Sequence, residues 1–301
     1  MTPALPFRGG AGGGECAPRS QALPHPPAPS PEGKGGKKHL VVTADDFGND
    51  VAVNEAVEIA HRSGILTAAS LMVGAPAAAD AVRRARTMPD LGVGLHLVLV
   101  DSTPVLPPAE VPGLVDGNGR FRDNMALAGA AMFFLPATRR QLAAEIEAQF
   151  AAFAATGLPL DHVNAHKHFH LHPTIAGLIA RIGARYGLRA VRAPIEPGAP
   201  SLTDPWARLV RRHFRGHGIA VPDAVFGLRH SGAMTAERVR EIVERLPDGL
   251  SEIYVHPATR DDYPGHGPAY RHRDELAALI DPGVRAAVVA ASARLGSFAS
   301  A

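Results

Sequence analysis

The stretch HLVVTADDFGNDVAVNEAVEIAHRSG, residues 39–64, sets a pattern that recurs along most of the chain. Its first seven residues are mainly apolar and rich in β-branched side chains, which predicts a strand over His39–Asp45. Apolar residues then recur three and four positions apart, which predicts a helix over Val51–Ser63 that Gly64 ends. A strand followed directly by a helix is the repeating unit of parallel α/β folds.

This alternation continues towards the C-terminal end. Further predicted strands lie at residues 66–73, 93–99, 160–164, 189–193, 224–228 and 251–255. Further predicted helices begin after Pro76 and Pro173 or lie at residues 139–155, 206–215, 236–245, 273–280 and 284–293. Residues 101–136 are punctuated by Pro and Gly, and we expect a long loop or small excursion there.

Seven strands alternating with helices predict a parallel sheet, either doubly wound or closed as a barrel. Neither GxGxxG after the first strand nor GxxxxGK[ST] occurs, which disfavours the nucleotide-binding folds. We therefore expect a distorted, incomplete (β/α) TIM-like barrel with parallel strands. Such barrels commonly form one domain of about 250 residues.

Composition separates the first 36 residues from the rest of the chain. Residues 1–36 contain eight Pro and eight Gly, and we expect a disordered segment there. Residues 37–301 are expected to form a single barrel domain. The one cysteine, Cys16, falls in the first segment, so cysteine-based zinc sites and iron–sulfur clusters are excluded. Any metal ligands must therefore be histidine and carboxylate side chains.

Charge and hydropathy indicate the compartment and exclude one class of partner. The 31 Lys and Arg residues nearly balance the 29 Asp and Glu residues, so we expect no nucleic-acid partner. No stretch of about 18 apolar residues occurs and the N-terminus lacks an apolar signal segment, so we expect a cytoplasmic protein. The sequence predicts no particular oligomeric state.

Polar residues gather where four of the predicted strands end. They are Asp45 with Asp46, His96, the histidines of the stretch 162–172, and His256. The carboxyl ends of barrel strands form the active-site face, so these residues are expected to meet there. Each has a simpler interpretation by itself, such as a helix cap for the aspartates or a hydrogen-bonded core position for a single histidine.

The stretch HVNAHKHFHLHP, residues 162–173, carries the strongest local signal. Its five histidines fall at even positions, and Pro173 disfavours helix before it, so we expect an extended chain with these rings on one side. One or two of the rings could bind a metal while others contact substrate or orient ligands. A solvated histidine-rich loop is the alternative.

One carboxylate and two imidazoles, with open positions for water, form the ligand set of a hydrolytic metal centre. A second carboxylate can take a proton from water, and a histidine can return one to a leaving group. These groups suit hydrolysis of an amide or an ester. We expect one divalent ion, zinc in the first place, with magnesium, cobalt, nickel or iron as alternatives.

The motifs TADDFGNDVAVNEAV, GILTAASLMV, GVGLHLVL, HVNAHKHFHLHP and EIYVHP resemble the YdjC-like carbohydrate deacetylases, which include the chitooligosaccharide deacetylases. The resemblance extends over Lys38–Ile280 and implies a distorted (β/α) barrel. The runs AASLMVGAPAAADAVRRAR, LPPAEVPGLVD and GLPLDHVNAHKHFHLHPTI are most similar to the members associated with hopanoid biosynthesis.

The resemblance implies roles for individual residues. Asp46 matches the metal-binding aspartate of the family motif, and Asp45 matches the catalytic base. His96 matches a metal ligand, and His166 is expected to be the second histidine ligand, with His168 as the alternative.

The remaining candidates lie nearer the substrate. His256 matches the histidine expected to donate a proton to the departing amine. His170 and Arg192 are further candidates for substrate binding or for alternative ligands. Ala258 stands where many relatives have Gly, which affects the expected path of that loop but not the chemistry.

The implied reaction removes the N-acetyl group from an N-acetylglucosamine unit on a bacteriohopanepolyol glycolipid. The alternatives are a soluble chitooligosaccharide substrate, or a protein that binds metal or glycan without catalysis. A glycolipid substrate would imply peripheral contact with the inner membrane. The run Met132–Leu135 is a candidate lipid-binding patch, although such a run is also typical of a core.

Overall fold

The strand β1 (Lys38–Phe47) runs through the middle of a parallel sheet in the computed structural model, which describes residues 37–198 and 204–301. Six strands follow the order β4-β3-β2-β1-β6-β5, and every neighbouring pair is parallel. The other strands are β2 (Ala68–Leu71), β3 (Gly92–Leu97), β4 (Val163–Ala165), β5 (Ala224–Phe226) and β6 (Gly249–Val255), with β7 (Arg294–Leu295) paired to the start of β1. The predicted incomplete parallel barrel is confirmed.

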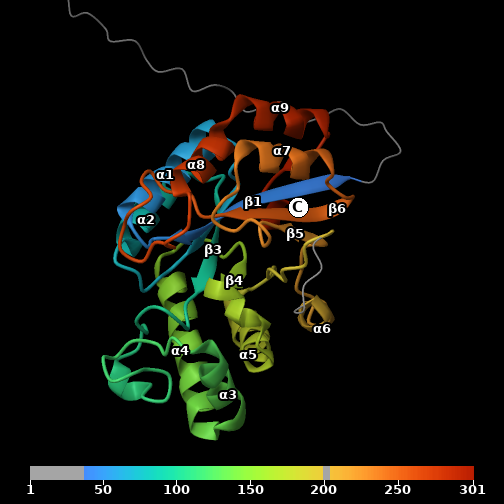
Figure 1. Ribbon diagram of the computed structural model, residues 1–301. Coiled ribbons are helices and arrows are strands. Elements are labelled where there is room, and N and C mark those ends of the chain that lie inside the picture. The colour runs from blue at the N-terminus through green and yellow to red at the C-terminus, as the bar shows by residue number, and fades with distance from the viewer. Residues whose placement is uncertain (1–36, 199–203) are drawn as a thin grey trace, which may run out of the picture. The chain divides into compact units, whose positions relative to one another are not determined.

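Helices connect the strands and pack around the sheet (Figure 1). They are α1 (Val51–Ser63), α2 (Ala78–Ala85), α3 (Met125–Phe134), α4 (Pro136–Ala155), α5 (Pro173–Gly183), α6 (Asp204–Gly216), α7 (Ala236–Glu244), α8 (His272–Ile280) and α9 (Pro282–Ala290). Short 3₁₀ turns are η1 (Pro108–Glu110), η2 (His166–Leu171), η3 (Ala184–Tyr186) and η4 (Phe298–Ser300). The helix after the first strand has the predicted bounds because the Asp50 side chain caps it, accepting from the Ala52 amide at 2.8 Å.

The prediction for residues 101–136 was wrong in one respect, because α3 lies within the expected loop. Asn124 caps this helix by accepting a hydrogen bond from the Leu127 amide at 3.0 Å. The sequence of α3 is almost entirely apolar and lacks the polar face that makes a surface helix recognisable.

A strand was also predicted at residues 189–193, where the structure has only isolated pairings. Val191 pairs with Val163 of β4, and Ala190 pairs with Ala220. Pro194 has no amide hydrogen, so a regular ladder cannot continue through it. The segment still spans the open side of the barrel, since the Ile195 carbonyl accepts from the Val225 amide of β5 at 2.9 Å.

The sheet is buried on both faces, which explains the continuous apolar runs of its strands. In β1, eight consecutive residues from Leu40 to Phe47 are buried, including both aspartates. Because the strands are parallel, the carboxyl ends of β1, β3, β4 and β6 lie at one edge. The polar clusters identified in the sequence follow or lie within these four strands.

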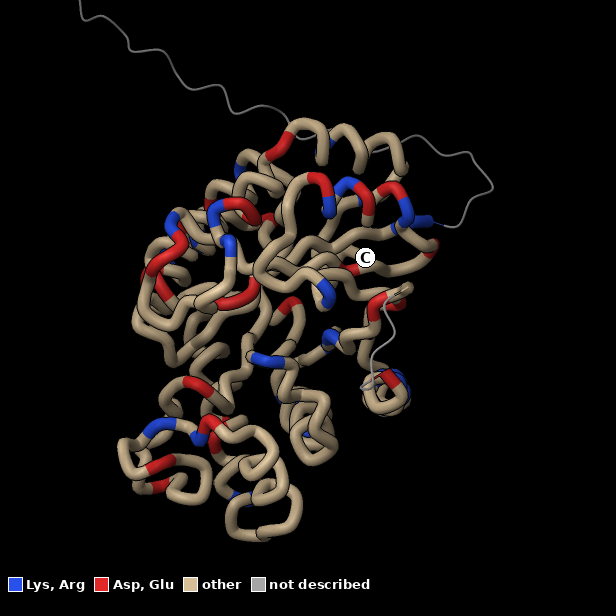
Figure 2. Tube along the Cα trace, viewed as in Figure 1, with Lys and Arg blue, Asp and Glu red and all other residues tan. Residues whose placement is uncertain are grey.

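The helices differ in charge. The helices α1, α2 and α7 carry both positive and negative residues, whereas α3 and α5 are almost free of charge (Figure 2). Among residues 37–198 and 204–301, none of the helices combines the length and apolarity needed to cross a bilayer. The predicted disordered segment, residues 1–36, lies outside the described residues.

Candidate metal centre

The two adjacent aspartates reach the same site because the end of β1 is irregular. The register with β2 shifts between Ala44 and Phe47, and Asp46 has a left-handed backbone with φ 62°. Aspartate tolerates this conformation better than most residues, and such irregularities often redirect a side chain beside an active site. Strict alternation along the strand would have sent Asp45 and Asp46 to opposite sides.

The expectation of an extended chain after His162 holds only as far as Ala165. The next residues form η2, and Lys167 and His168 have left-handed φ values of 51° and 54°. Left-handed residues end the two-residue alternation of a strand, so the histidines point in different directions. As a result, only His166 of this turn approaches Asp46.

Three ligand-type side chains from three different segments converge at this point. Asp46 Oδ1 lies 3.3 Å from His96 Nε2 and 3.2 Å from His166 Nδ1. All three atoms lie within 4.8 Å of one another, and the Asp46 and His96 side chains are almost completely buried. These are the three residues that the sequence predicted as metal ligands, and His168 is not among them.

A hydrogen-bond chain fixes the orientation of the His96 ring. Both carboxylate oxygens of Asp45 accept from Arg192, so the nearby amide of Asn164 must present its NH₂ group to Asp45 and Ser70, at 2.9 and 2.8 Å. The Asn164 oxygen therefore faces His96 Nδ1 at 2.6 Å and accepts its hydrogen.

The other ring nitrogen of His96 is consequently a bare acceptor. It faces a carboxylate oxygen of Asp46, and neither atom has a hydrogen-bond partner within the described part of the chain. Two acceptors this close repel each other unless a cation lies between them. The donor set therefore fits a divalent ion, which Asp46, His96 and His166 would hold.

The buried charges at this edge also favour a cation. Arg192 is completely buried and donates to both Asp45 and Glu252, the latter at 2.8 and 3.0 Å. Its guanidinium lies 4.4 Å from the centre of the Tyr254 ring. One positive charge thus serves two carboxylates, and Asp46 adds a third, which leaves the region negative.

Arg192, a sequence-based candidate for substrate binding or an alternative ligand, is buried and hydrogen-bonded to Asp45. Burial opposes ionisation of Asp45, but the charge of Arg192 outweighs it and holds the Asp45 pKa well below its ordinary value of 3.8. Burial opposes ionisation of Asp46 as well, and there the charge of His166 outweighs it and holds the pKa of Asp46 well below its ordinary value. Both aspartates are ionised near neutral pH.

A second set of buried polar residues supports Asp45 and was not predicted. Ser70 donates to Asp45 Oδ1 at 3.1 Å, and its hydroxyl lies 2.9 Å from His162 Nε2. His162 Nδ1 is 3.0 Å from Asp161 Oδ2. The sequence signal was an isolated serine within an apolar strand.

Glu252 was also missed, although it is a charged residue inside the apolar run GLSEIYV of β6. Its Oε1 accepts from Thr43 of β1 at 2.8 Å in addition to Arg192. A charge in the middle of a buried strand requires a partner, and that rule could have identified it.

His256 lies beside both aspartates at the end of β6. Burial lowers its pKa, while the charges of Asp46 and Asp45 act in the opposite direction. Its Nδ1 is buried without a hydrogen-bond partner among the described residues. The hydrogen-bonding capacity of this nitrogen is therefore unused among the described residues.

The main chain of His256 is held by α8. Its amide donates to Glu275 Oε2 at 2.5 Å, and its carbonyl lies 2.6 Å from His272 Nδ1. Glu275 also accepts from the Met234 amide at 3.0 Å, and burial raises the Glu275 pKa to about 7. These contacts fix the loop after β6 in place.

His168 and His170 surround the site without joining the three-residue cluster. His168 Nε2 lies 3.1 Å from the Tyr254 hydroxyl, and burial lowers the His168 pKa well below its ordinary value. His170 is completely buried, and burial together with the charge of Arg192 lowers its pKa to about 3. Both rings are neutral near pH 7.

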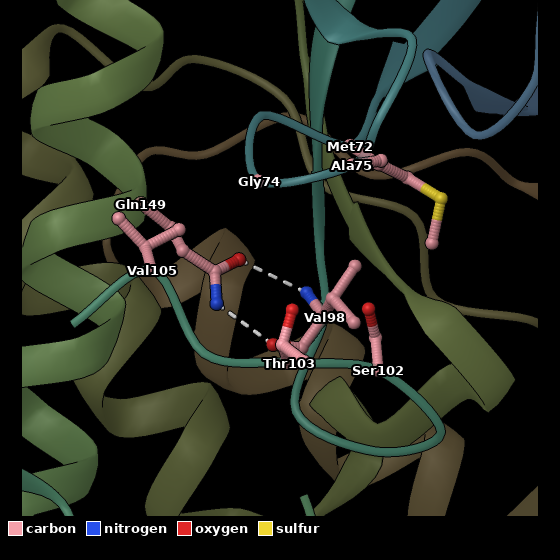
Figure 3. A pocket seen from close by; sticks show the side chains of 8 residues that line it. All are labelled: Met72, Gly74, Ala75, Val98, Ser102, Thr103, Val105 and Gln149. Atoms are coloured by element: carbon pink, nitrogen blue, oxygen red, sulfur yellow. Dashed lines mark hydrogen bonds between the residues drawn. The ribbon is translucent and has the colours of Figure 1, made fainter. Parts of the chain in front are cut away.

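The loop after His96 is held by α4. Gln149 accepts from the Val98 amide at 3.0 Å and donates to the Val98 carbonyl at 2.7 Å, beside a small cavity (Figure 3). Glu145, one turn earlier, accepts from the Val105 and Leu106 amides at 2.9 and 3.0 Å. The end of β3 that carries His96 is thereby anchored to a helix.

Comparison with known proteins shows the family to which the chain belongs. The model of the family described as YdjC-like protein matches residues 39–290. The chain belongs to the YdjC-like family. A carbohydrate deacetylase of Geobacillus stearothermophilus is 34% identical over 249 residues, which are 81% of this chain and 90% of that protein.

Two further proteins are similar to this chain over most of their length. A chitooligosaccharide deacetylase of Yersinia pestis (strain Pestoides F) is 29% identical, covering 87% of this chain and 98% of that protein. A crystal structure from Enterococcus faecalis V583, named for cellobiose-phosphate cleavage, is 24% identical with a TM-score of 0.72, covering 88% of this chain and 98% of that one. At that identity the structural likeness concerns the fold alone.

Proposed function

We propose that this YdjC-like protein is a metal-dependent carbohydrate deacetylase that hydrolyses the N-acetyl group of an N-acetylglucosamine unit. The observation that carries this proposal is the pair of facing, unpartnered acceptors on Asp46 and His96, with His166 beside them. Zinc suits two imidazoles and one carboxylate. When bound, the ion would polarise the acetyl carbonyl and make water nucleophilic near neutral pH.

The residues of the chain supply the proton transfers. Asp45 is ionised and held by Arg192, so it can accept the proton of the attacking water. His256 then returns a proton to the departing amine. Burial favours its neutral ring, so it must first gain that proton, and the two aspartates favour this step.

A glycolipid is the acceptor that we propose, with the sugar carried on a hopanoid side chain. Supporting this, Phe133, Phe134 and Leu135 of the predicted lipid patch are exposed, whereas Met132 is buried. Phe133 also packs against His172 at the end of the turn that carries His166, with ring centres 6.2 Å apart. A soluble chitooligosaccharide is the second candidate, because a relative bears that name.

Asp45→Asn tests the catalytic role. We expect the metal content to be retained and acetate release to fall by at least about a hundredfold, because the general base is lost. Asp50→Asn is the matched control, since asparagine caps a helix as well as aspartate and acetate release should be unchanged. Metal analysis and an acetate assay measure both. Undiminished release by Asp45→Asn would rule out this role, and a wild type that binds zinc but releases no acetate would indicate a binding protein.

Mass spectrometry of the products distinguishes the two acceptors. An N-acetylglucosaminyl hopanoid and chitobiose are each incubated with the zinc-loaded enzyme. We expect loss of an acetyl group from the hopanoid. Turnover of chitobiose alone would overturn the glycolipid assignment while leaving the deacetylase assignment intact.

A further inference from the structure

Exposed apolar side chains gather on α3, at the residue that follows it, and on α6. We name this set the apolar rim, and its members are Leu127, Phe133, Phe134, Leu135, Trp206 and Leu209. Phe134 is 73% exposed and Leu127 is 68% exposed, and they lie on one face because they are two helical turns apart. The surface of a soluble protein rarely exposes a group of large apolar side chains unless the group is an interaction site.

The two halves of the rim meet at the end of the turn η2. The rings of Phe134 and Phe133 are 4.9 Å apart, and Phe133 packs on His172. From the other side, Trp206 Nε1 donates a hydrogen bond to the carbonyl of Leu171. The rim is therefore continuous along the segment that begins with His166.

Positive charge accompanies the apolar residues. The helix α6 contains four arginines and one aspartate, and Arg208 and Arg212 are exposed beside Leu209. Near α3, Arg139 lies 6.0 Å from the centre of the Phe133 ring, and Arg140 is exposed next to it. The helix α3 carries no charge at all, as the uniform tan of its tube shows (Figure 2).

We propose that the apolar rim docks this protein on a bilayer containing anionic lipid. Aromatic and leucine side chains flanked by arginines are the composition of surfaces that lie at the headgroup level. The apolar groups would be buried among the acyl chains, and the arginines would contact lipid phosphates. Docking there brings the segment with His166 close to the membrane.

The inference builds on the proposed glycolipid substrate, because it explains how an enzyme whose described helices do not span a membrane would meet a molecule held in a bilayer. It concerns lipid binding alone, however, and vesicle binding is measured without substrate. Failure of hopanoid turnover would therefore leave it standing, and failure of vesicle binding would leave the deacetylase assignment standing.

Sedimentation with sucrose-loaded vesicles tests the proposal. We expect the zinc-loaded full chain to bind vesicles of phosphatidylglycerol and phosphatidylcholine, and to bind pure phosphatidylcholine more weakly. Phe134→Ser and Leu209→Ser should each lower the partition coefficient for these vesicles by about tenfold, because each removes an exposed apolar side chain that would enter the acyl chains. Arg212→Gln should reduce binding to anionic vesicles only.

Val289→Ser is the matched control, since Val289 is 66% exposed on α9, at the opposite end of the view from α3 (Figure 1). It should bind vesicles like the wild type, and thermal unfolding verifies that each variant is folded. No binding by the wild type, or equal loss with Val289→Ser, would overturn the proposal. A dimer in sedimentation velocity that Phe134→Ser dissociates would also overturn it, because the rim would then be covered by a second copy.

Discussion

At the scale of single residues, Asn164 connects the two halves of the site. Its NH₂ group serves Asp45 and Ser70, and its oxygen serves His96. One amide therefore holds the proposed base and sets which nitrogen of His96 is free for a metal. Partners of this kind orient metal-binding histidines and raise their basicity.

Replacing this amide should weaken metal binding directly. For Asn164→Ala we expect the dissociation constant for zinc to rise by about 10- to 100-fold, because the His96 ring loses the acceptor that fixes its tautomer. Competition with a chromophoric chelator measures it without reference to catalysis. Asn118→Ala, at an exposed loop position, should bind zinc like the wild type. An unchanged constant for Asn164→Ala would mean that the ring is oriented by other contacts.

At the scale of elements, the sequence predicted those helices and strands whose apolar residues recur with the period of the face that is buried. Helices such as α1 and strands such as β1 have the expected type and nearly the expected bounds, because their apolar spacing reflects the face they bury. The turn η2 could not be foreseen, since its two left-handed residues, Lys167 and His168, are neither glycine nor asparagine. The contacts between distant segments could not be predicted from the sequence either, since residues such as Ser70 and Asn164 are 94 positions apart.

Gly94 of β3 is constrained by such a contact with a distant segment. A Cβ atom built there would lie 2.5 Å from the His162 ring, which Ser70 and Asp161 hold from both sides. Gly94→Ala should therefore lower the free energy of unfolding by about 1–3 kcal/mol. Gly177→Ala, in α5 with open space around it, should raise it by about 0.5–1 kcal/mol. Denaturant titration measures both, and a neutral Gly94→Ala would show that His162 is free to move.

At the scale of the whole molecule, the buried histidines make stability depend on pH. Burial lowers the pKa values of His168, His170 and His256 in the folded protein. Below about pH 6.5 the unfolded chain binds protons at these positions that the folded protein does not bind. These histidines therefore make the free energy of unfolding fall as the pH is lowered. Glu275 acts in the opposite direction. Between pH 4.5 and about 7 its carboxyl group is protonated in the folded protein and ionised in the unfolded chain, so this residue makes the free energy of unfolding fall as the pH rises.

His170→Gln isolates one of these contributions. Folded His170 stays neutral down to a pKa of about 3, against an ordinary value of 6.5, so across that window the unfolded state binds one more proton. The free energy of unfolding therefore rises with pH there, and this residue adds about 1.4 kcal/mol per pH unit. Urea unfolding between about pH 4 and 6 should show a slope smaller by that amount in His170→Gln, whatever its absolute stability. Glu275 and the other histidines are common to both proteins and cancel in the difference. An identical slope would mean that His170 is protonated in the folded state, and the neutral ring inferred from its burial beside Arg192 would be wrong.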